Sequence, residues 1–400
     1  MNTETRWFTL FLASIAALTS LSIDMSLSTV PAIEHEFGLV AGRGGLTMSV
    51  FLAGYAFTPL VGGPLADRFG RRPVLLVALA CFAISALACS LSPSFTLLLG
   101  FRLLQGCASG VSTTLPLAIV RDLLSGPAAR RRMSEVTTVN SLMPIVAPIL
   151  GSAIMVLGRW RIIFGAQAAF AGCILLALLL EFKESLPPER RHQLEAISLI
   201  GDCARLLKSR TFLSYALING LIFACIFSFI SVSPLILMQR MGVGVHTYPL
   251  FFAFVASGGV AGSLLSTVLS RRHVSSHRVI VTGLLIMTFA STGAVVLQIV
   301  GFHRPIFLLI PAFSTLFGSY LIVPSVTVEA VEPIPHLAGS GSGVLRSILM
   351  LFGSGASSFL AIYCGRHFAQ TEIATTITML TAASMALFIY LRLHRDPVAA

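Results

Sequence analysis

The chain has 400 residues, of which 56% are hydrophobic and only 11% are charged. Soluble domains keep roughly a quarter of their residues charged, so this composition excludes a soluble globular protein and predicts an integral membrane protein. The formal net charge of +11 does not indicate nucleic-acid binding, because the basic residues lie in short loops between apolar runs and form no continuous polar face.

Apolar runs recur along the whole chain at lengths that suit helices crossing a bilayer. Such a helix needs about 20 apolar residues, whereas the strands of a membrane β-barrel would be shorter and would alternate polar with apolar residues. The first run starts at Trp7 and is too long for a cleaved signal peptide, so we expect a retained helix. The sequence predicts an all-α membrane fold of twelve transmembrane helices, at roughly 7–30, 46–66, 73–91, 96–119, 134–157, 160–181, 211–237, 247–269, 279–300, 305–327, 339–363 and 371–391.

Lys and Arg are distributed unequally between the two sets of connecting segments. With the N-terminus inside, the inside segments hold 19 of these residues and the outside segments hold six. Cytoplasmic loops collect positive charge, so we expect both termini in the cytoplasm. The segment 328–338 does not follow this pattern, since it carries Glu329 and Glu332 and no basic residue.

The longest polar segment divides the chain into two halves. It covers residues 182–210, where Pro187 and Pro188 interrupt the helical pattern and an amphipathic stretch that would lie on the membrane surface follows. We therefore expect an N-terminal six-helix bundle over 1–181, a cytoplasmic linker over 182–210 and a C-terminal six-helix bundle over 211–400. Two pseudo-symmetric bundles are typical of secondary transporters.

Two charged residues lie deep inside the predicted spans of the first half, away from the span ends. Asp24 is roughly 17 residues into the first span, about 25 Å from its start, and Arg102 is about 9 Å from the outer end of the fourth. Ionisable groups at such depth are costly and are functional candidates by default. Both residues lie about six positions from the outer end of their spans, so we predict that Arg102 controls the protonation of Asp24, directly or through water or Gln105. The alternative for each is a purely structural charge.

The stretch GPLADRFGRR, residues 63–72, concentrates charge between the second and third spans. We expect the second helix to end at Gly63, which would also allow close packing with a neighbouring helix, and Asp67 to be an anion at a cytoplasmic turn. Asp122, at the end of the fourth span, is a candidate partner of Arg71 or Arg72. The remaining members of this charged stretch are Arg68 and Gly70.

The fifth span is interrupted by Pro144, Pro148 and Gly151, which predict a kink and a close helix contact. Two GxxxG patterns, Gly106–Gly110 and Gly258–Gly262, predict tight helix packing. The sequence contains no CxxC, zinc spacing or nucleotide-binding loop, and we expect no metal or cofactor.

These stretches resemble the major facilitator superfamily. GPLADRFGRR resembles its motif A, LLLGFRLLQGCASG (97–110) its motif B, and APILGS (147–152) its antiporter motif C, with Ala147 where Gly is usual. Asp24 in SIDMSLSTVPAI resembles the first-helix acid of drug:proton antiporters of the bicyclomycin/chloramphenicol-resistance (Bcr/CflA) branch. WRIIF (160–164) and PHLAGSGSG (335–343) are similar to that branch, whereas Ser26 and Ser28 depart from its usual Tyr and Pro.

The resemblance implies roles for several residues. Proton and substrate would compete around Asp24, the kink of motif C would seal the substrate path, and Asp67 would meet the helix that starts near 340–342 and so act as a gate. Candidate residues of a substrate cavity are Asn140, Phe223, Phe227 and Arg346. The alternative for Phe223 and Phe227 is a lipid-facing or core position. The alternative for Arg346 is a structural ion pair with Glu329 or Glu332.

The expected function is proton-coupled efflux of small lipophilic compounds such as antibiotics by alternating access, with the proton as the coupling ion. The alternatives are a dedicated proton-coupled exporter of a metabolite or siderophore and, less favoured, an importer. We expect a monomeric, multi-pass protein of the bacterial inner membrane that binds lipid and a small molecule and no nucleic acid. An enzyme is not expected, since no nucleophile–base pair or metal cluster is evident.

Overall fold

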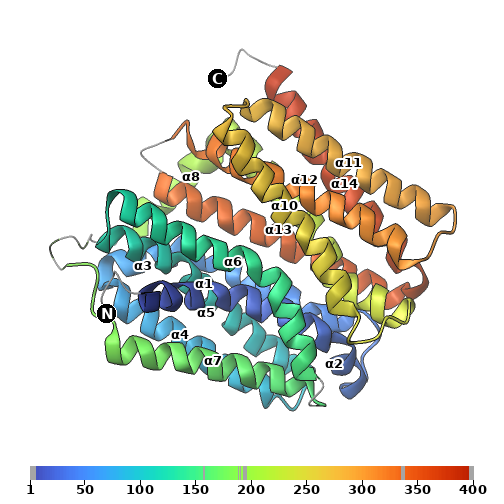
Figure 1. Ribbon diagram of the computed structural model, residues 1–400, viewed down its shortest axis with the longest axis horizontal. Coiled ribbons are helices and arrows are strands. Elements are labelled where there is room, and N and C mark those ends of the chain that lie inside the picture. The colour runs from blue at the N-terminus through green and yellow to red at the C-terminus, as the bar shows by residue number, and fades with distance from the viewer. Residues whose placement is uncertain are drawn as a thin grey trace. The chain divides into compact units, whose positions relative to one another are not determined.

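A computed structural model describes residues 6–155, 158–187, 189, 191, 196–334 and 338–395 of the chain. Within these residues the secondary structure is helical, and twelve helices are long and apolar enough to cross a membrane, which confirms the predicted fold class. In Figure 1 these helices are coloured from blue at the N-terminus to red at the C-terminus. The first three residues of PHLAGSGSG and part of the predicted linker lie outside the described residues.

The chain forms two compact units. The first unit contains residues 1–32 and 50–196, and the second contains residues 33–49 and 197–400. The segment between the first two spans thus belongs by its contacts to the second unit, although it precedes most of the first unit in sequence.

The first unit is a bundle of six membrane helices, in which α4 packs against both α5 and α7, and α1 packs against α5 and α6 (Figure 1). Gly106 and Gly110 of α5 lie directly against the backbone of α3, since a Cβ at either position would collide with Phe51, Tyr55 or Thr58. The first GxxxG pattern is therefore a close helix contact, as predicted. Its helices are α1 (Arg6–Asp24), α3 (Leu46–Phe69), α4 (Arg71–Ser90), α5 (Phe95–Leu123), α6 (Gly126–Met155) and α7 (Trp160–Glu181).

The second unit packs α9 against α12, α13 and α14, and α12 against α10 and α11. The second GxxxG pattern is again a close contact, because Gly258 and Gly262 lie against Phe313 and Phe317 of α12. The predicted amphipathic stretch of the linker forms α8 (Ala196–Lys208). The membrane helices are α9 (Arg210–Pro234), which continues as a π-helical turn (Leu235–Arg240), α10 (Tyr248–Arg271), α11 (Ser276–Ile299), α12 (Pro305–Val331), α13 (Ala338–Arg366) and α14 (Thr371–Arg395).

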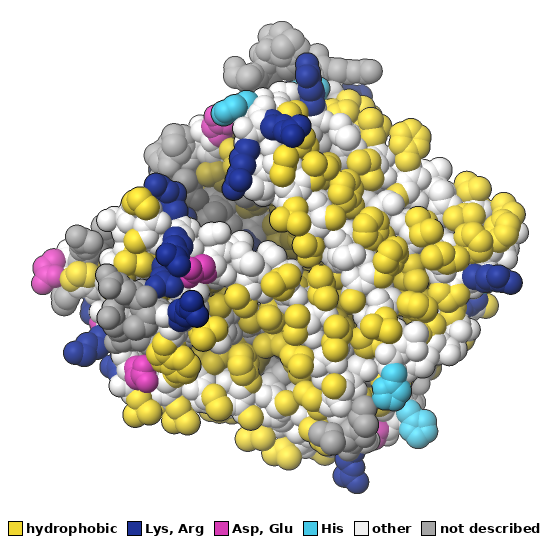
Figure 2. All heavy atoms as spheres, in the orientation of Figure 1, with side chains coloured by type: hydrophobic (Ala, Val, Ile, Leu, Met, Phe, Trp, Pro, Cys, Tyr) yellow, Lys and Arg dark blue, Asp and Glu magenta, His cyan; other side chains and the backbone are white. Residues whose placement is uncertain are grey.

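Hydrophobic side chains are spread over the visible face, and Lys and Arg side chains lie mainly towards its margins (Figure 2). Exposed apolar side chains well inside spans include Ile84 and Phe289. Such a surface requires lipid as its solvent, which agrees with the exclusion of a soluble protein on composition.

Candidate functional site

The first span is broken at Asp24. The α-helical part of the span ends at this residue, a 3₁₀ helix covers Met25–Thr29, and α2 (Val30–Glu36) completes the span. Pro31 favours the tighter turn before it, because it has no N–H to donate to the carbonyl of Leu27, four residues earlier. Ser26 and Thr29 stabilise the turn by donating to backbone carbonyls, Ser26 to those of Ser22 and Ile23. An interrupted helix at membrane depth is typical of transport sites.

Arg102 is the centre of a buried polar network in the first unit. Its Nη1 donates to Gln105 Oε1 at 2.7 Å and to Ser22 Oγ at 3.1 Å. Gln105 Nε2 in turn donates to Gln167 Oε1 at 3.0 Å. The guanidinium also lies over two aromatic rings, those of Phe51 at 4.5 Å and Phe164 at 5.5 Å. These contacts satisfy a charge that would otherwise be costly at this depth.

The hydrogen-bonded network around Arg102 connects three helices, α1, α5 and α7. Ser22 is two positions before Asp24 on α1, Arg102 and Gln105 come from α5, and Gln167 comes from α7. Gln167 was not among the predicted residues. It also borders an apolar pocket of about 350 Å³ that is lined by α1, α6 and α7.

The carboxylate of Asp24 takes no part in this network. In the described part of the chain it forms no hydrogen bond or ion pair with Arg102 or with any other residue. The residue is nevertheless buried, with only 6% of its surface exposed. The structure thus brings Arg102 and Gln105 together. Asp24 is the last residue of α1 and follows the network residue Ser22 by two positions. An ionised carboxylate that is buried without a partner is unfavourable, so such a residue is suited to binding a proton.

The fifth span, α6, packs its predicted hinge residues against the break in the first span. Pro148 and Gly151 are buried, and a Cβ at Gly151 would lie 2.5 Å from the backbone oxygen of Met25. Pro144 lies one turn before Pro148 within the same continuous helix. The glycine therefore allows α6 to contact the 3₁₀ turn directly after Asp24.

The charged stretch 63–72 has a different structure from the one expected. The predicted end of the helix at Gly63 is wrong, because α3 continues through Pro64 to Phe69. Pro removes one backbone donor, which membrane helices tolerate, and the chain turns instead at Gly70, whose φ is +100°. Within the first unit Gly63 makes no close approach, since a Cβ there would meet nothing within 4 Å.

Arg71 links both acids of this region. Its Nη1 lies 2.7 Å from Asp67 and its Nε lies 2.8 Å from Asp122. Arg72 does not share this bridge and donates to the backbone oxygen of Leu179 at 3.0 Å. Arg68 is exposed and lies over the ring of Phe69. The predicted contact of Asp67 with residues 340–342 would join the two units and stays a prediction.

Glu184 completes the same region and was missed. Its Oε1 accepts from the backbone N–H of Arg71 at 2.9 Å, and its Oε2 accepts from that of Arg72 at 3.1 Å. A carboxylate at the N-terminus of α4 satisfies free backbone donors and complements the helix dipole. The signal in the sequence was weak, because a Glu in the polar segment 182–210 is an ordinary surface residue.

The predicted cavity residues lie on several helices. Asn140 is half-buried on α6. Phe223 and Phe227 of α9 lie 6.0 Å apart between ring centroids, and Phe227 packs against Gly353 of α13. Arg346 is exposed on α13, and the suggested pair with Glu329 or Glu332 does not form among the described residues.

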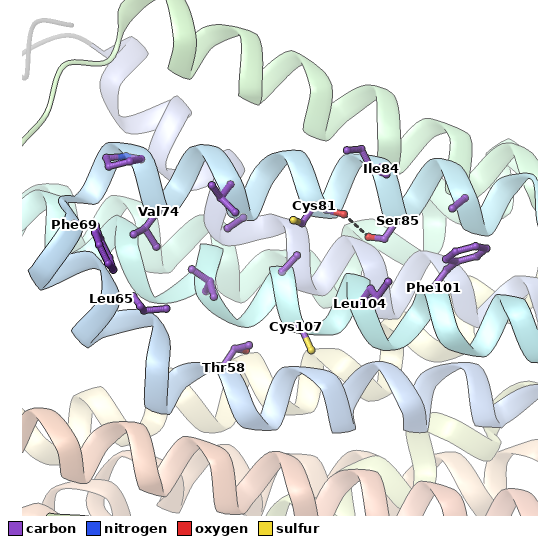
Figure 3. A pocket seen from close by; sticks show the side chains of 16 residues that line it. Thr58, Leu65, Phe69, Val74, Cys81, Ile84, Ser85, Phe101, Leu104 and Cys107 are labelled. Carbon is purple, nitrogen blue, oxygen red and sulfur yellow. Dashed lines mark hydrogen bonds between the residues drawn. The ribbon is translucent and has the colours of Figure 1, made fainter. Parts of the chain in front are cut away.

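A second pocket of the first unit, of about 650 Å³, lies elsewhere. Its walls come from α3, α4 and α5, and Figure 3 shows Phe69, Ile84, Phe101 and Leu104 around it. The lining is almost entirely apolar and includes none of the network residues. It is a groove among side chains that are suited to contact with lipid.

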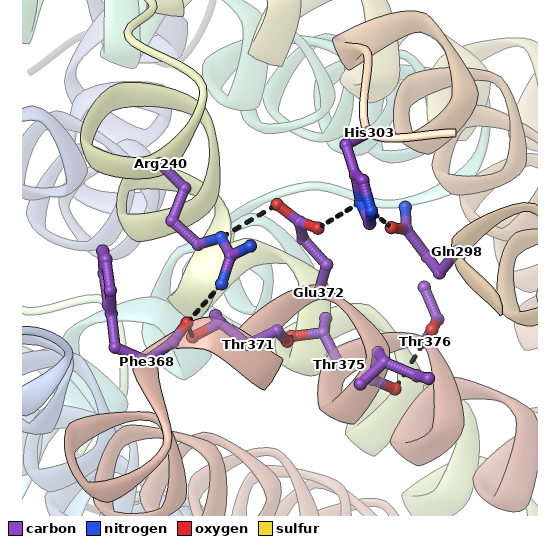
Figure 4. Close-up of polar contacts among 9 residues, drawn as sticks. Arg240, Gln298, His303, Phe368, Thr371, Glu372, Thr375 and Thr376 are labelled. Atoms are coloured by element: carbon purple, nitrogen blue, oxygen red, sulfur yellow. Dashed lines mark hydrogen bonds and ion pairs between the residues drawn. The ribbon is translucent and has the colours of Figure 1, made fainter. Parts of the chain in front are cut away.

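A buried acid organises one end of the second unit (Figure 4). Glu372, at the start of α14, lies 3.0 Å from Arg240 Nε of the π-helical turn and 3.1 Å from His303 Nδ1 of the α11–α12 loop. Arg240 also donates to the backbone oxygen of Phe368. The cluster ties three segments together and could not be predicted, since its members are distant in sequence and each resembles an ordinary loop residue.

Twelve membrane-spanning helices in two compact units, with charged residues buried inside the spans, are typical of a secondary transporter. The chain belongs to the Major Facilitator Superfamily, whose family model matches residues 12–358.

Several known proteins are similar to the chain. The MFS-type transporter YdgK of Bacillus subtilis (strain 168) is 30% identical over 354 residues, which cover 88% of this chain and 87% of YdgK. The multidrug resistance protein MdtL of Escherichia coli (strain K12 / DH10B) is 32% identical over 243 residues, and that match spans only 61% of each protein.

Solved structures share the fold. A bacterial homologue of the human lysosomal transporter Spinster, in an inward-facing and occupied conformation, superposes with a TM-score of 0.76 at 17% identity and covers 97% of this chain and 96% of the homologue. A D-xylose–proton symporter reaches 0.72 at 15% identity and covers 96% of this chain and 97% of the symporter.

Proposed function

We propose that the protein exports small lipophilic compounds in exchange for protons, as a monomer in the bacterial inner membrane with both termini in the cytoplasm. Membership of the superfamily supports small-molecule transport, and the similarity to MdtL supports drug efflux. The resemblance to the Bcr/CflA branch in the stretch around Asp24 supports the same assignment.

The observation that carries the proposal is the isolated carboxylate of Asp24 at the break in the first span. The neutral, protonated form is tolerated at this site, whereas the ionised form needs water or a cationic partner. Alternating access would expose Asp24 to water on one side and then on the other. A proton that binds on one side and leaves on the other would thereby be coupled to cargo, provided that each favours a different conformation.

Arg102 is the positioning residue in this mechanism. Its contacts to Ser22 hold the last turn of α1, so a change in the backbone at Asp24 is transmitted to the guanidinium. The connection through Gln105 and Gln167 extends this constraint to α7. Arg71 with Asp67 and Asp122 would act separately, as a contact at the far end of α3 that must change as the bundles move.

The test is Asp24→Asn in proteoliposomes with an imposed pH gradient. Accumulation of a panel of neutral, cationic and anionic antibiotics should fall to the level of protein-free vesicles, because the amide cannot carry a proton. Asp24→Glu, which keeps a titratable group, should retain part of the activity. Wild-type rates that persist in Asp24→Asn, or transport that an uncoupler does not affect, would reject the proposal.

A further inference from the structure

Arg346 is a charged residue within a membrane span. It lies on α13, six positions after Ser340, where the candidate span begins, and so about 9 Å along the helix. It is exposed. An arginine at this depth is tolerated when it faces a water-filled space or an acidic partner.

The helical periodicity of α13 shows which side carries Arg346. Gly353 and Ser357 follow it by 7 and 11 positions and therefore lie within about 20° of the same face. Both pack against α9, since a Cβ at Gly353 would lie 2.6 Å from the ring of Phe227 and Ser357 Oγ donates to the backbone oxygen of Phe227 at 3.4 Å. Arg346 is thus on the face that turns towards protein.

The lipid-suited side of α13 is a different one. Leu351, Phe359 and Ile362 are exposed apolar residues of the same helix. They lie about 140–160° around the helix from Arg346. Arg346 is therefore exposed on the inward face of α13 and does not reach into lipid. Its charge remains accessible there.

Among the described residues, no acid of the second unit forms an ion pair with Arg346. Glu372 is bound by Arg240 and His303, and Glu34 accepts from two backbone N–H groups and from Gln239. Glu329 and Glu332 form no ion pair with Arg346 in the residues described. An accessible guanidinium on an inward face is thus available to a ligand.

We propose that Arg346 binds the acidic group of the cargo, so that the preferred substrates are lipophilic compounds that carry one carboxylate or phosphate. A guanidinium presents paired N–H donors that match the two oxygens of such a group. The inference rests on the proposed efflux function and narrows its substrate class from lipophilic compounds in general to lipophilic organic anions.

The test compares carboxylates with their own amides, which have nearly the same size but no charge. Benzoate, 2-naphthoate and 1-pyrenecarboxylate would each be assayed against the corresponding carboxamide in proteoliposomes with a pH gradient. The wild type should prefer the carboxylate. Arg346→Gln should lower the carboxylate-to-carboxamide ratio about tenfold or more, as expected for the loss of one charge-assisted hydrogen-bonded pair, and Arg346→Lys should retain part of the preference.

Arg366→Gln is the matched control, because Arg366 is an exposed arginine in the last turn of the same helix. It should leave the ratio unchanged. The inference is wrong if the carboxylate-to-carboxamide ratio is the same in the wild type and Arg346→Gln. It is also wrong if only neutral and cationic compounds are transported. Either result would leave the proposed efflux function intact. If no compound moves at all, the efflux function itself fails.

A lipid phosphate offers the same chemistry as the cargo, so the assay is repeated with and without phosphatidylglycerol in the vesicles. The proposal expects the ratio of each variant to be the same in both. If the effect of Arg346→Gln occurs only with phosphatidylglycerol and is equal for carboxylates and carboxamides, Arg346 binds lipid and the inference is wrong.

Discussion

Gly151 connects α6, the fifth span, with the 3₁₀ turn that follows Asp24 in the first span. Its missing side chain allows α6 to touch the backbone of Met25 directly after Asp24. Gly151→Ala would place a Cβ 2.5 Å from Met25 O and 2.9 Å from Met25 Cα. Because backbone cannot yield as a flexible side chain can, we expect a loss of about 1–3 kcal/mol in stability, as for overpacked cores, together with slower transport.

The measurement is the apparent melting temperature of the purified protein in detergent, followed by transport in proteoliposomes. Gly172→Ala on α7 is the control, because a Cβ there meets nothing within 4 Å. If both substitutions leave the melting temperature unchanged, the close contact between α6 and the 3₁₀ turn does not contribute as described.

Residues of the site differ in how far the sequence could reveal them. Asp24 and Arg102 could be found because a charge inside an apolar run is rare for an energetic reason. Ser22 and Gln167 could not, since uncharged polar residues are common in membrane helices and their roles depend on which helices meet. The same holds for Glu184, which becomes a helix cap only because residues 182–186 fold back against α4.

At the scale of elements, the start of α4 depends on Glu184. Its two oxygens accept from the backbone N–H groups of Arg71, Arg72, Ser185 and Leu186. Glu184→Ala leaves these donors without the carboxylate, and we expect a loss of about 1–2 kcal/mol, as for other N-terminal helix caps. Glu184→Gln, which keeps one oxygen, should lose less.

Thermal unfolding of the purified variants measures this effect, with Glu189→Ala, an exposed acid of the same segment, as the control. An unchanged melting temperature in Glu184→Ala would show that water replaces the cap at no cost. A loss of equal size in Glu189→Ala would assign the effect to overall charge.

The elements show where hydropathy predicts well and where it does not. All twelve spans could be located from the lengths of their apolar runs. Their internal breaks and ends could not, because backbone geometry decides them. The first span changes helix type after Asp24, whereas α3 passes through Gly63 and Pro64 without ending. Gly and Pro are weaker signals in membrane helices than in soluble ones, since neighbouring groups satisfy the backbone.

At the scale of the whole molecule, the chain order does not determine the compact units. Residues 33–49 join the second unit, where Glu34 accepts from Gln239 at 2.7 Å and from the backbone of Gly42 and Gly44. Because α2 and α3 run from this segment into the first unit, any displacement of one unit acts on the first span. The break after Asp24 is a place where such a displacement can be absorbed.

The proposed orientation of the molecule predicts which loops are accessible from each side of the membrane. Arg271, the last residue of α10, and Arg304, which precedes α12, are exposed and lie before and after α11 in the chain. The 24 residues of α11 extend about 36 Å, enough to cross the hydrocarbon core. With both termini in the cytoplasm, Arg43→Cys and Arg304→Cys should react with a membrane-impermeant maleimide in intact spheroplasts, because both lie on outside segments. Arg271→Cys should react only after the membrane is permeabilised. The wild type gives the background, since six of its cysteines lie in spans and Cys203 lies on the linker helix α8. The reverse labelling pattern would require an inverted topology, in which the charge distribution no longer explains the insertion of the chain.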